Sequence, residues 1–303
     1  MSDARPNLFI VGAPKCGTTS LYEYLRVHPD VFFPHDDSAF SRTKEPNHFC
    51  PELEIRPKHA ITDRDEYFAL YADAGRQRWR GDASTSHLHS TQAAANIRAA
   101  CPDARILIML RPPLDFMRSY HSELLRHDHE DIADFHTAVD ASADRAAGRR
   151  IPPRSGVPRN LDYHAMARFA PQVARYFEVF GRDRVRVILL EDLVADTADT
   201  YAGVLDFLGI DARFRPEFRV HNEAPATGTI ERSLKRIYAN PAVQGVVKAL
   251  LPYEARRRVL LRLRKADAAR VDADPRDAAL RASCRDDIDA LATLIGRDLR
   301  HWH

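Results

Sequence analysis

The sequence predicts an α/β fold: a doubly wound, P-loop-like parallel sheet flanked by helices, with a helical C-terminal extension. Short runs of apolar residues at 8–11, 105–110 and 185–190 have strand length and are too uniformly apolar for strands with one face in water. Segments with apolar residues at helical spacing separate these runs. Such alternation is typical of a sheet whose ligand binds at the carboxyl ends of the strands.

We expect one domain over residues 1–303, with a core at about 7–222 and a helical part at about 223–303. No low-complexity run, internal repeat or linker divides the chain. A chain of this length buries about three quarters of its unfolded surface, so a full core is feasible. The 45 basic and 43 acidic residues give a net charge of +2, which does not favour nucleic acid as a partner.

Composition also predicts where the protein works. The first residues carry no export signal, and no apolar stretch has the length of a membrane span. We therefore expect a cytoplasmic protein without a transmembrane segment. The four cysteines share no close spacing, so neither a structural zinc site nor a disulfide framework is expected. The oligomeric state stays open, a homodimer included.

The first predicted strand leads into a loop that suits an anion. Glycines at 12 and 17 interrupt the apolar run, and helical spacing resumes at Leu21. A strand, a tight loop and a helix in this order bring backbone N–H groups to the helix N-terminus, which binds phosphate or sulfate. The candidate anion-binding residues are Lys15, Cys16, Gly17, Thr18, Thr19 and Ser20.

The glycine spacing resembles a Walker A loop, but Thr18 stands where that loop has its lysine. The lysine lies earlier, at Lys15, in the arrangement Pro-Lys-x-Gly-Thr-Thr. This arrangement resembles the 5′-phosphosulfate loop of sulfotransferases that use 3′-phosphoadenosine 5′-phosphosulfate (PAPS). The resemblance implies that Lys15 neutralises charge on the leaving 5′-phosphate. An ordinary turn with a solvated lysine is the alternative.

A short apolar strand at 31–33 and a polar loop lead to the hexapeptide KEPNHF at 44–49. The hexapeptide resembles the Lys-Glu-Pro-x-x-Phe segment of Golgi-type and bacterial sulfotransferases. That resemblance implies that Glu45 takes the proton of the acceptor. By itself, such a charged hexapeptide would be a solvated turn.

A second candidate base follows the predicted strand and turn at 79–86. The family often has Gly-Glu-Lys-Ser-Pro-x-Tyr here, and Asp82 and Ser84 match this pattern while Ala83, Thr85 and His87 depart from it. The cytosolic branch of the same superfamily has a catalytic histidine near this place. His87 is therefore the alternative base, and a hydrogen-bonded structural histidine is the other interpretation.

The apolar run at 105–110 ends at Arg111. A Walker-B-type NTPase would place an aspartate there to hold Mg²⁺, so the sequence does not favour an NTPase and implies no metal. The segment RPPLDFMRS at 111–119 resembles the 3′-phosphate segment of sulfotransferases. The resemblance implies that Arg111 and Ser119 bind this phosphate. Pro113 suits the first turn of a helix that should reach about Arg126.

The other elements are predicted from periodicity and caps. We expect helices at 92–100, 163–180 and 197–208, the last closed by Gly209, and a helix that opens with a capping box at 62–65 and ends near Gly75. The segment 140–160 lacks periodicity and is interpreted as a long loop, which in compact domains is often a lid. A final helix should begin at Asp274-Pro275.

Beyond Phe218 the signal weakens. Arg232, Lys235 and Arg236 are candidates for late contacts with the nucleotide. We expect a basic helix at 256–265, which would be either a solvated face or a site for an acidic acceptor or a membrane surface.

The resemblance covers residues 7 to about 209 and implies a PAPS-dependent sulfotransferase. Such an enzyme moves a sulfuryl group in line to a hydroxyl or amine of a small-molecule, carbohydrate or lipid acceptor and releases 3′-phosphoadenosine 5′-phosphate (PAP). A P-loop kinase or NTPase and a catalytically inactive nucleotide-binding module are the alternatives. The sequence does not identify the acceptor, because loops rather than the fold select it.

Overall fold

The computed structural model describes residues 5–35, 42–218 and 274–303. The predictions for Arg232, Lys235, Arg236 and the basic helix at 256–265 lie outside the described residues.

Five parallel strands form one sheet in the order β2-β3-β1-β4-β5. Their bounds are β1 (Leu8–Gly12), β2 (Val31–Phe32), β3 (Trp79–Asp82), β4 (Arg105–Leu110) and β5 (Val185–Leu189). All of β1 is buried, and β4 is buried except for its partly exposed first residue. The apolar runs at 8–11 and 105–110 are therefore interior strands, whereas the run at 185–190 forms β5, a partly exposed strand at the edge of the sheet. The predicted doubly wound α/β class is confirmed.

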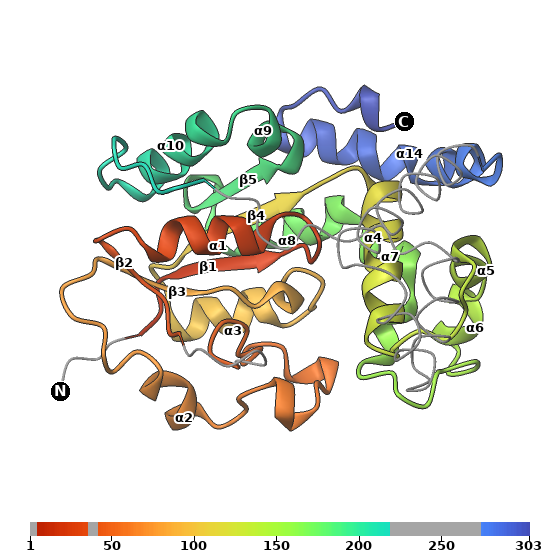
Figure 1. Ribbon diagram of the computed structural model, residues 1–303, viewed down its shortest axis with the longest axis horizontal. Coiled ribbons are helices and arrows are strands. Elements are labelled where there is room, and N and C mark those ends of the chain that lie inside the picture. The colour runs from red at the N-terminus through yellow and green to blue at the C-terminus, as the bar shows by residue number, and fades with distance from the viewer. Residues whose placement is uncertain (1–4, 36–41, 219–273) are drawn as a thin grey trace, which may run out of the picture.

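The strand order reverses around β1 (Figure 1). From β1 the chain passes to the edge strand β2 and returns to β3, beside β1. It then crosses to β4 and β5 on the other side of β1. Right-handed crossovers in opposite directions place the connecting helices on opposite faces. Ligands of such sheets bind at the carboxyl ends of the strands near the reversal.

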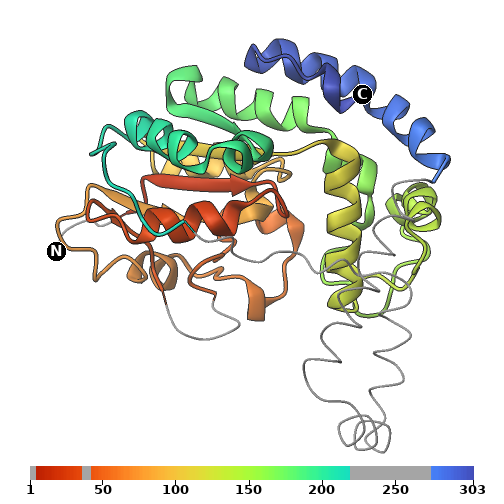
Figure 2. The ribbon, with the colours of Figure 1, turned by 45° about the horizontal axis from the view of Figure 1, so that its top comes forward.

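Helices cover both faces and the carboxyl edge of the sheet (Figures 1 and 2). On one face α1 lies beside α10, where Tyr201 donates a hydrogen bond to the carbonyl of Tyr24 (3.0 Å). On the other face α3 packs against α8. The helices α4 to α7 stand together beyond the strand ends, on the right of Figure 1. The bounds are α1 (Thr18–Arg26), α2 (Arg64–Ala69), α3 (Ala93–Ala100), α4 (Pro113–Arg126), α5 (Phe135–Asp140), α6 (Ser142–Ala146), α7 (Tyr163–Ala167), α8 (Phe169–Phe180), α9 (Leu190–Ala195), α10 (Thr197–Leu208) and α14 (Arg276–Ile295).

Short 3-10 turns connect several of these elements, at Pro51–Leu53, Pro57–His59, Thr85–His87, Pro158–Leu161, Arg182–Arg184 and Arg300–Trp302. Among the helices in the described part of the chain, none combines the length and the apolar character needed to cross a membrane.

The start of α2 differs from its prediction by one residue. The N-cap is Asp63 rather than Thr62, and its carboxylate accepts a hydrogen bond from the backbone N–H of Glu66 (2.8 Å). Asp63 and Glu66 have the three-residue spacing of a capping box. The helix also ends earlier than predicted, at Ala69, and turns follow it.

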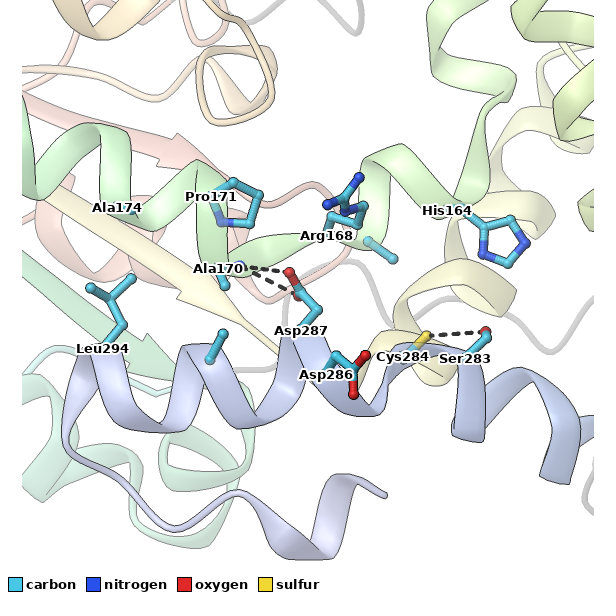
Figure 3. A pocket seen from close by; sticks show the side chains of 12 residues that line it. His164, Arg168, Ala170, Pro171, Ala174, Ser283, Cys284, Asp286, Asp287 and Leu294 are labelled. Carbon is cyan, nitrogen blue, oxygen red and sulfur yellow. Dashed lines mark hydrogen bonds between the residues drawn. The ribbon is translucent and has the colours of Figure 1, made fainter.

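The predicted helix at 163–180 is two helices, α7 and α8, with a break at Arg168. The ring of Pro171 would clash with the carbonyl of Ala167, four residues earlier, if one helix continued through both. The first N–H groups of α8 find a partner on α14. The carboxylate of Asp287 accepts hydrogen bonds from Phe169 (2.8 Å) and Ala170 (3.3 Å), as Figure 3 shows for Ala170.

The prediction of a long loop at 140–160 holds only for 147–157, where the structure has no helix or strand. This segment contains α6 and most of the turn at Pro158–Leu161. The guanidinium of Arg145, fully buried, lies 2.5 Å from the Glu130 carboxylate, which also accepts a hydrogen bond from Tyr163 (2.7 Å). A buried ion pair ties this segment to the helices around it, so the segment gives no support to the lid interpretation.

Candidate functional site

A cavity of about 620 Å³ opens where β1 and β4 end, at the reversal of the strand order. The loop after β1, the first turn of α1, the segment at 44–45, the turn after β3, α4 and α9 all contribute to its walls. The structure brings together in this cavity most of the residues that the sequence singled out. These are Lys15, Gly17, Thr18, Thr19, Ser20, Glu45, Arg111 and Ser119.

The loop after β1 turns through two residues with positive φ. Lys15 has φ 63° and Gly17 has φ 84°. A Cβ atom on Gly17 would lie 2.8 Å from Cδ1 of Leu190, so the close approach of α9 also requires glycine here. The helix α1 starts directly after Gly17 without a side-chain cap. Its first N–H groups have no intrahelical acceptor, and the residues that carry them line the cavity.

The ammonium group of Lys15 lies 2.9 Å from a carboxylate oxygen of Glu123 on α4. Arg126 (2.9 Å) and His127 (3.2 Å) contact the same carboxylate. Burial alone would raise the pKa of Glu123, but the hydrogen bond and charge of Lys15, with the charges of Arg126 and His127, lower it. Glu123 is therefore an anion beside Lys15, and any anionic ligand of this lysine competes with it.

Arg111 leaves β4 and reaches the same loop. One of its terminal nitrogens donates a hydrogen bond to the carbonyl of Lys15 (3.2 Å). Its Nε is buried and has no hydrogen-bond partner within the described ranges. A buried donor without a partner costs about 1–3 kcal/mol, and an anionic group in the cavity would remove that cost. Ser119, two turns along α4, lines the same cavity.

Glu45 is held in place by the backbone of its segment and by hydrogen bonds to its carboxylate. The segment that carries it docks onto the end of β3, where Ala83 donates to the carbonyl of Lys44 (3.2 Å). One carboxylate oxygen accepts a hydrogen bond from the ammonium of Lys44 (3.2 Å), and the other accepts one from the hydroxyl of Thr85 (3.1 Å). The carboxylate is thereby held on the cavity wall, where it can accept a proton from a substrate.

His87 is buried rather than exposed to the cavity. Both of its ring nitrogens lack a hydrogen-bond partner in the part of the chain that the structure describes, and its carbonyl accepts a hydrogen bond from Tyr176 (2.9 Å). Burial lowers the pKa of His87, despite the nearby carboxylates of Asp82, Glu45 and Glu52. Of the two candidate bases, Glu45 lines the cavity and His87 does not.

Cys16 is also buried, although it belongs to the anion loop. Burial raises the pKa of its thiol to about 12, against the opposing effect of Arg111 and Lys15. The side chain is therefore a protonated part of the core. Its backbone N–H donates to the carbonyl of Ala13 (3.3 Å), and Cys16 does not line the cavity, so its part in anion binding stays a prediction from sequence.

Several wall residues were not predicted from the sequence. Lys44 and Thr85 lie beside Glu45, and Glu123 lies one turn after Ser119 on the same face of α4. The helical spacing of Ser119 and Glu123 is a signal that could have revealed Glu123. An apolar wall comes from α9 and the start of α10, with Leu190, Leu193, Val194 and Thr197.

A larger hollow, of about 690 Å³, lies between α8 and α14 (Figure 3). Its walls carry several alanines, and Asp287 there caps α8. None of the predicted site residues within the described ranges lines it. The smaller cavity at the strand ends is therefore the candidate site.

The fold and the cavity together define a P-loop-like α/β protein with a cavity lined by basic residues at the turn after its first strand. The chain belongs to the Sulfotransferase family, whose model matches residues 6–214.

Individual relatives agree with this assignment. Carbohydrate sulfotransferase 15 of Rattus norvegicus is 24% identical over 273 residues, which cover 74% of this chain and 47% of that protein. The bifunctional heparan sulfate N-deacetylase/N-sulfotransferase 1 of Mus musculus is 26% identical over 222 residues, which cover 69% of this chain and 22% of that protein. The chain thus spans about half the length, or less, of these curated relatives. A sulfotransferase from Alicyclobacillus acidocaldarius has 29% identity, a TM-score of 0.67 and 99% coverage of both chains.

Proposed function

We propose that the protein is a sulfotransferase that moves a sulfuryl group from PAPS to a hydroxyl or amine of its acceptor. One observation carries the proposal: the loop of Lys15, the Arg111 guanidinium and the Glu45 carboxylate all face a single cavity. A cation-rich anion site and a base thus adjoin each other, as group transfer to an acceptor requires.

In this proposal the cavity holds the nucleotide at both of its phosphate ends. Lys15 and the first N–H groups of α1, with Thr18, Thr19 and Ser20, bind the 5′-phosphosulfate end. Arg111 and Ser119 bind the 3′-phosphate, since the planar guanidinium fork suits a phosphate group. The apolar wall from α9 packs against the adenine ring.

PAPS supplies an activated sulfuryl group on a phosphate leaving group. Glu45 accepts the proton of the acceptor hydroxyl or amine as the acceptor atom bonds to sulfur. The bond between sulfur and the bridging oxygen breaks, and PAP leaves with the bonding electron pair. Lys15 stabilises the charge that develops on the departing 5′-phosphate. Glu45 then returns its proton to water.

Among the acceptor classes we favour a carbohydrate, because curated relatives are named for carbohydrates and heparan sulfate. A small molecule or a lipid is the alternative. The single domain of 303 residues, the cytoplasmic location and the homodimer stay predictions from sequence.

A turnover assay tests the proposal. The purified protein should release PAP from PAPS when supplied with an acceptor from a panel of hydroxyl- and amine-bearing carbohydrates, lipids and phenols. ATP and Mg²⁺ should not replace PAPS, whereas a P-loop kinase would require them. Binding of PAP without turnover on a broad panel would instead support an inactive nucleotide-binding module.

A further inference from the structure

Lys44 lines the cavity, and neither its sequence context nor the proposed reaction gives it a role. Its ammonium nitrogen donates to the hydroxyl of Thr19 (3.0 Å) and to a carboxylate oxygen of Glu45 (3.2 Å). Thr19 belongs to the first turn of α1, and Glu45 lies on the wall of the same cavity. Lys44 therefore connects the anion site with the base.

We propose that Lys44 is a catalytic residue whose ammonium group contacts the sulfuryl oxygens during transfer. This inference rests on the proposed function. In-line transfer places the moving group between the leaving phosphate at α1 and the acceptor atom at Glu45. A side chain that touches both Thr19 and Glu45 is beside that path.

The charge balance of the cavity supports this role. Lys15 is paired with the carboxylate of Glu123, which stays ionised. The partner carboxylate of Lys44 is the base itself. When Glu45 takes the acceptor proton, its carboxylate becomes neutral, and the positive charge of Lys44 is no longer compensated. The charge thus becomes available to the sulfuryl oxygens as the transition state forms, where it accelerates the reaction.

The surroundings of Lys44 increase the effect of its charge. Only 23% of its side chain is exposed, and its ammonium group lies 5.5 Å from the centre of the Tyr22 ring. Partial exclusion of water strengthens electrostatic interactions. At the adjoining end of β3, the buried residue Ala83 offers no charge, and its N–H binds the carbonyl of Lys44 (3.2 Å). The cation on this wall is supplied by Lys44.

A purely positioning role for Lys44 makes a different prediction. If Lys44 only oriented the Glu45 carboxylate, it would resemble Thr85, which holds the other carboxylate oxygen at 3.1 Å. Thr85→Ala is therefore the matched variant for positioning. Lys58→Ala, at an exposed lysine outside the cavity, controls for the loss of a positive charge.

The test compares turnover with binding. Lys44→Ala should lower kcat at saturating PAPS by about 10²- to 10³-fold, as the removal of a preorganised charge-stabilising group does. Its affinity for PAP, measured by calorimetry, should stay within about threefold of wild type, because PAP lacks the sulfuryl group. Lys44→Arg, which keeps the charge, should recover part of the rate. Thr85→Ala should lower kcat by less than Lys44→Ala, and Lys58→Ala should leave it unchanged.

A double variant separates contact with the sulfuryl group from an effect through the base. In a Glu45→Gln background, Lys44→Ala should still reduce the remaining rate by at least about tenfold, since residual transfer still develops charge on the sulfuryl oxygens. No further loss in that background would overturn the inference, as would a PAP affinity that falls as much as kcat. If wild type turns over PAPS and Lys44→Ala does so at the same rate, the role of Lys44 is overturned while the proposed function stands. Failure of wild type to turn over PAPS with any acceptor would overturn the proposed function as well.

Discussion

At the scale of single residues, the cavity gathers three cations around the loop that follows β1: Lys15, Lys44 and Arg111. Each already has a partner on the protein, since Lys15 contacts Glu123, Lys44 contacts Glu45 and Arg111 contacts the carbonyl of Lys15. These partners keep the cations in place at the cavity wall. They also make binding selective, because a ligand must replace the interactions that these cations already have within the protein. A weakly charged ligand offers too little interaction energy to do so.

Lys15→Ala should retain the fold and lose most of the activity. Lys15 is the cation on the loop itself, and the removal of such a group typically reduces kcat by about 10²- to 10³-fold. Circular dichroism checks the fold, and PAP release measures the rate. A folded variant with a rate within a few-fold of wild type would show that this loop is not the phosphosulfate site.

Glu45→Gln should lower kcat by about 10²- to 10⁴-fold, the usual contribution of a general base. His87→Asn should leave kcat within a few-fold of wild type, because the His87 ring is buried and does not line the cavity. Both rates are measured at saturating PAPS. A near-normal rate for Glu45→Gln beside a collapsed rate for His87→Asn would reverse the assignment of the base.

At the scale of elements, the sequence predicted what local chemistry determines. The bounds of β4, α4 and α10 match the predictions, because uniform apolar runs, an N-terminal proline and a closing glycine are local signals. The break at Arg168 was missed because helical periodicity continues through it. The helix α6 was missed because Arg145, an arginine in a segment without periodicity, is buried by a partner fifteen residues away.

Gly17→Ala should disturb the anion loop itself. The added Cβ would lie 2.8 Å from Cδ1 of Leu190, and the alanine would have to adopt the φ of 84° that glycine has at this position. Gly148 is a matched control, since its φ is 76° but a Cβ there meets nothing within 4 Å. We expect Gly148→Ala to reduce the free energy of unfolding by about 1–2 kcal/mol from backbone strain alone. Gly17→Ala should reduce it further and should also weaken PAP binding, as urea unfolding and calorimetry can measure. Equal effects on stability and an unchanged PAP affinity would contradict this account of the loop.

Glu130→Gln should be strongly destabilising, because it leaves the buried guanidinium of Arg145 without a counter-charge. Loss of one partner of a buried ion pair costs about 3–5 kcal/mol. Asp128→Asn, which removes the partner of the exposed Arg154, should cost at most about 1 kcal/mol. Equal unfolding free energies for the two variants would contradict the role of the buried pair.

The same pair predicts a pH dependence. Burial would raise the pKa of Glu130, but the hydrogen bond of Arg145, with those of Ile132 and Tyr163, lowers it below the ordinary value of 4.5. A carboxylate with a lowered pKa in the folded state stabilises the protein above that ordinary value, and this contribution disappears as the pH falls through the folded pKa. Urea unfolding of wild type should therefore show stability falling below about pH 4.5, more steeply than in Glu130→Gln. Parallel pH profiles would contradict this assignment.

At the scale of the whole molecule, the arrangement of the site follows from the strand order. The loops after β1 and β4 meet because these strands are neighbours at the reversal of the sheet, although Lys15 and Arg111 are far apart in sequence. The resemblance located these two segments, but it did not reveal that Lys44 and Glu123 face them. Those contacts join residues 25 and 108 positions apart, Lys44 with Thr19 and Lys15 with Glu123, and only the folded chain brings them together.

Calorimetry with PAP and with AMP, which lacks the 3′-phosphate, tests whether this cavity is the PAPS site. Wild type should bind PAP more tightly than AMP. A hydrogen bond to a charged group is worth about 1.5–3 kcal/mol, so Arg111→Ala should lower the binding affinity for PAP by at least about tenfold. The affinity for AMP should hardly change. If wild type binds both nucleotides equally, or if Arg111→Ala weakens both to the same extent, Arg111 does not bind a 3′-phosphate and the assignment of this cavity to PAPS is contradicted.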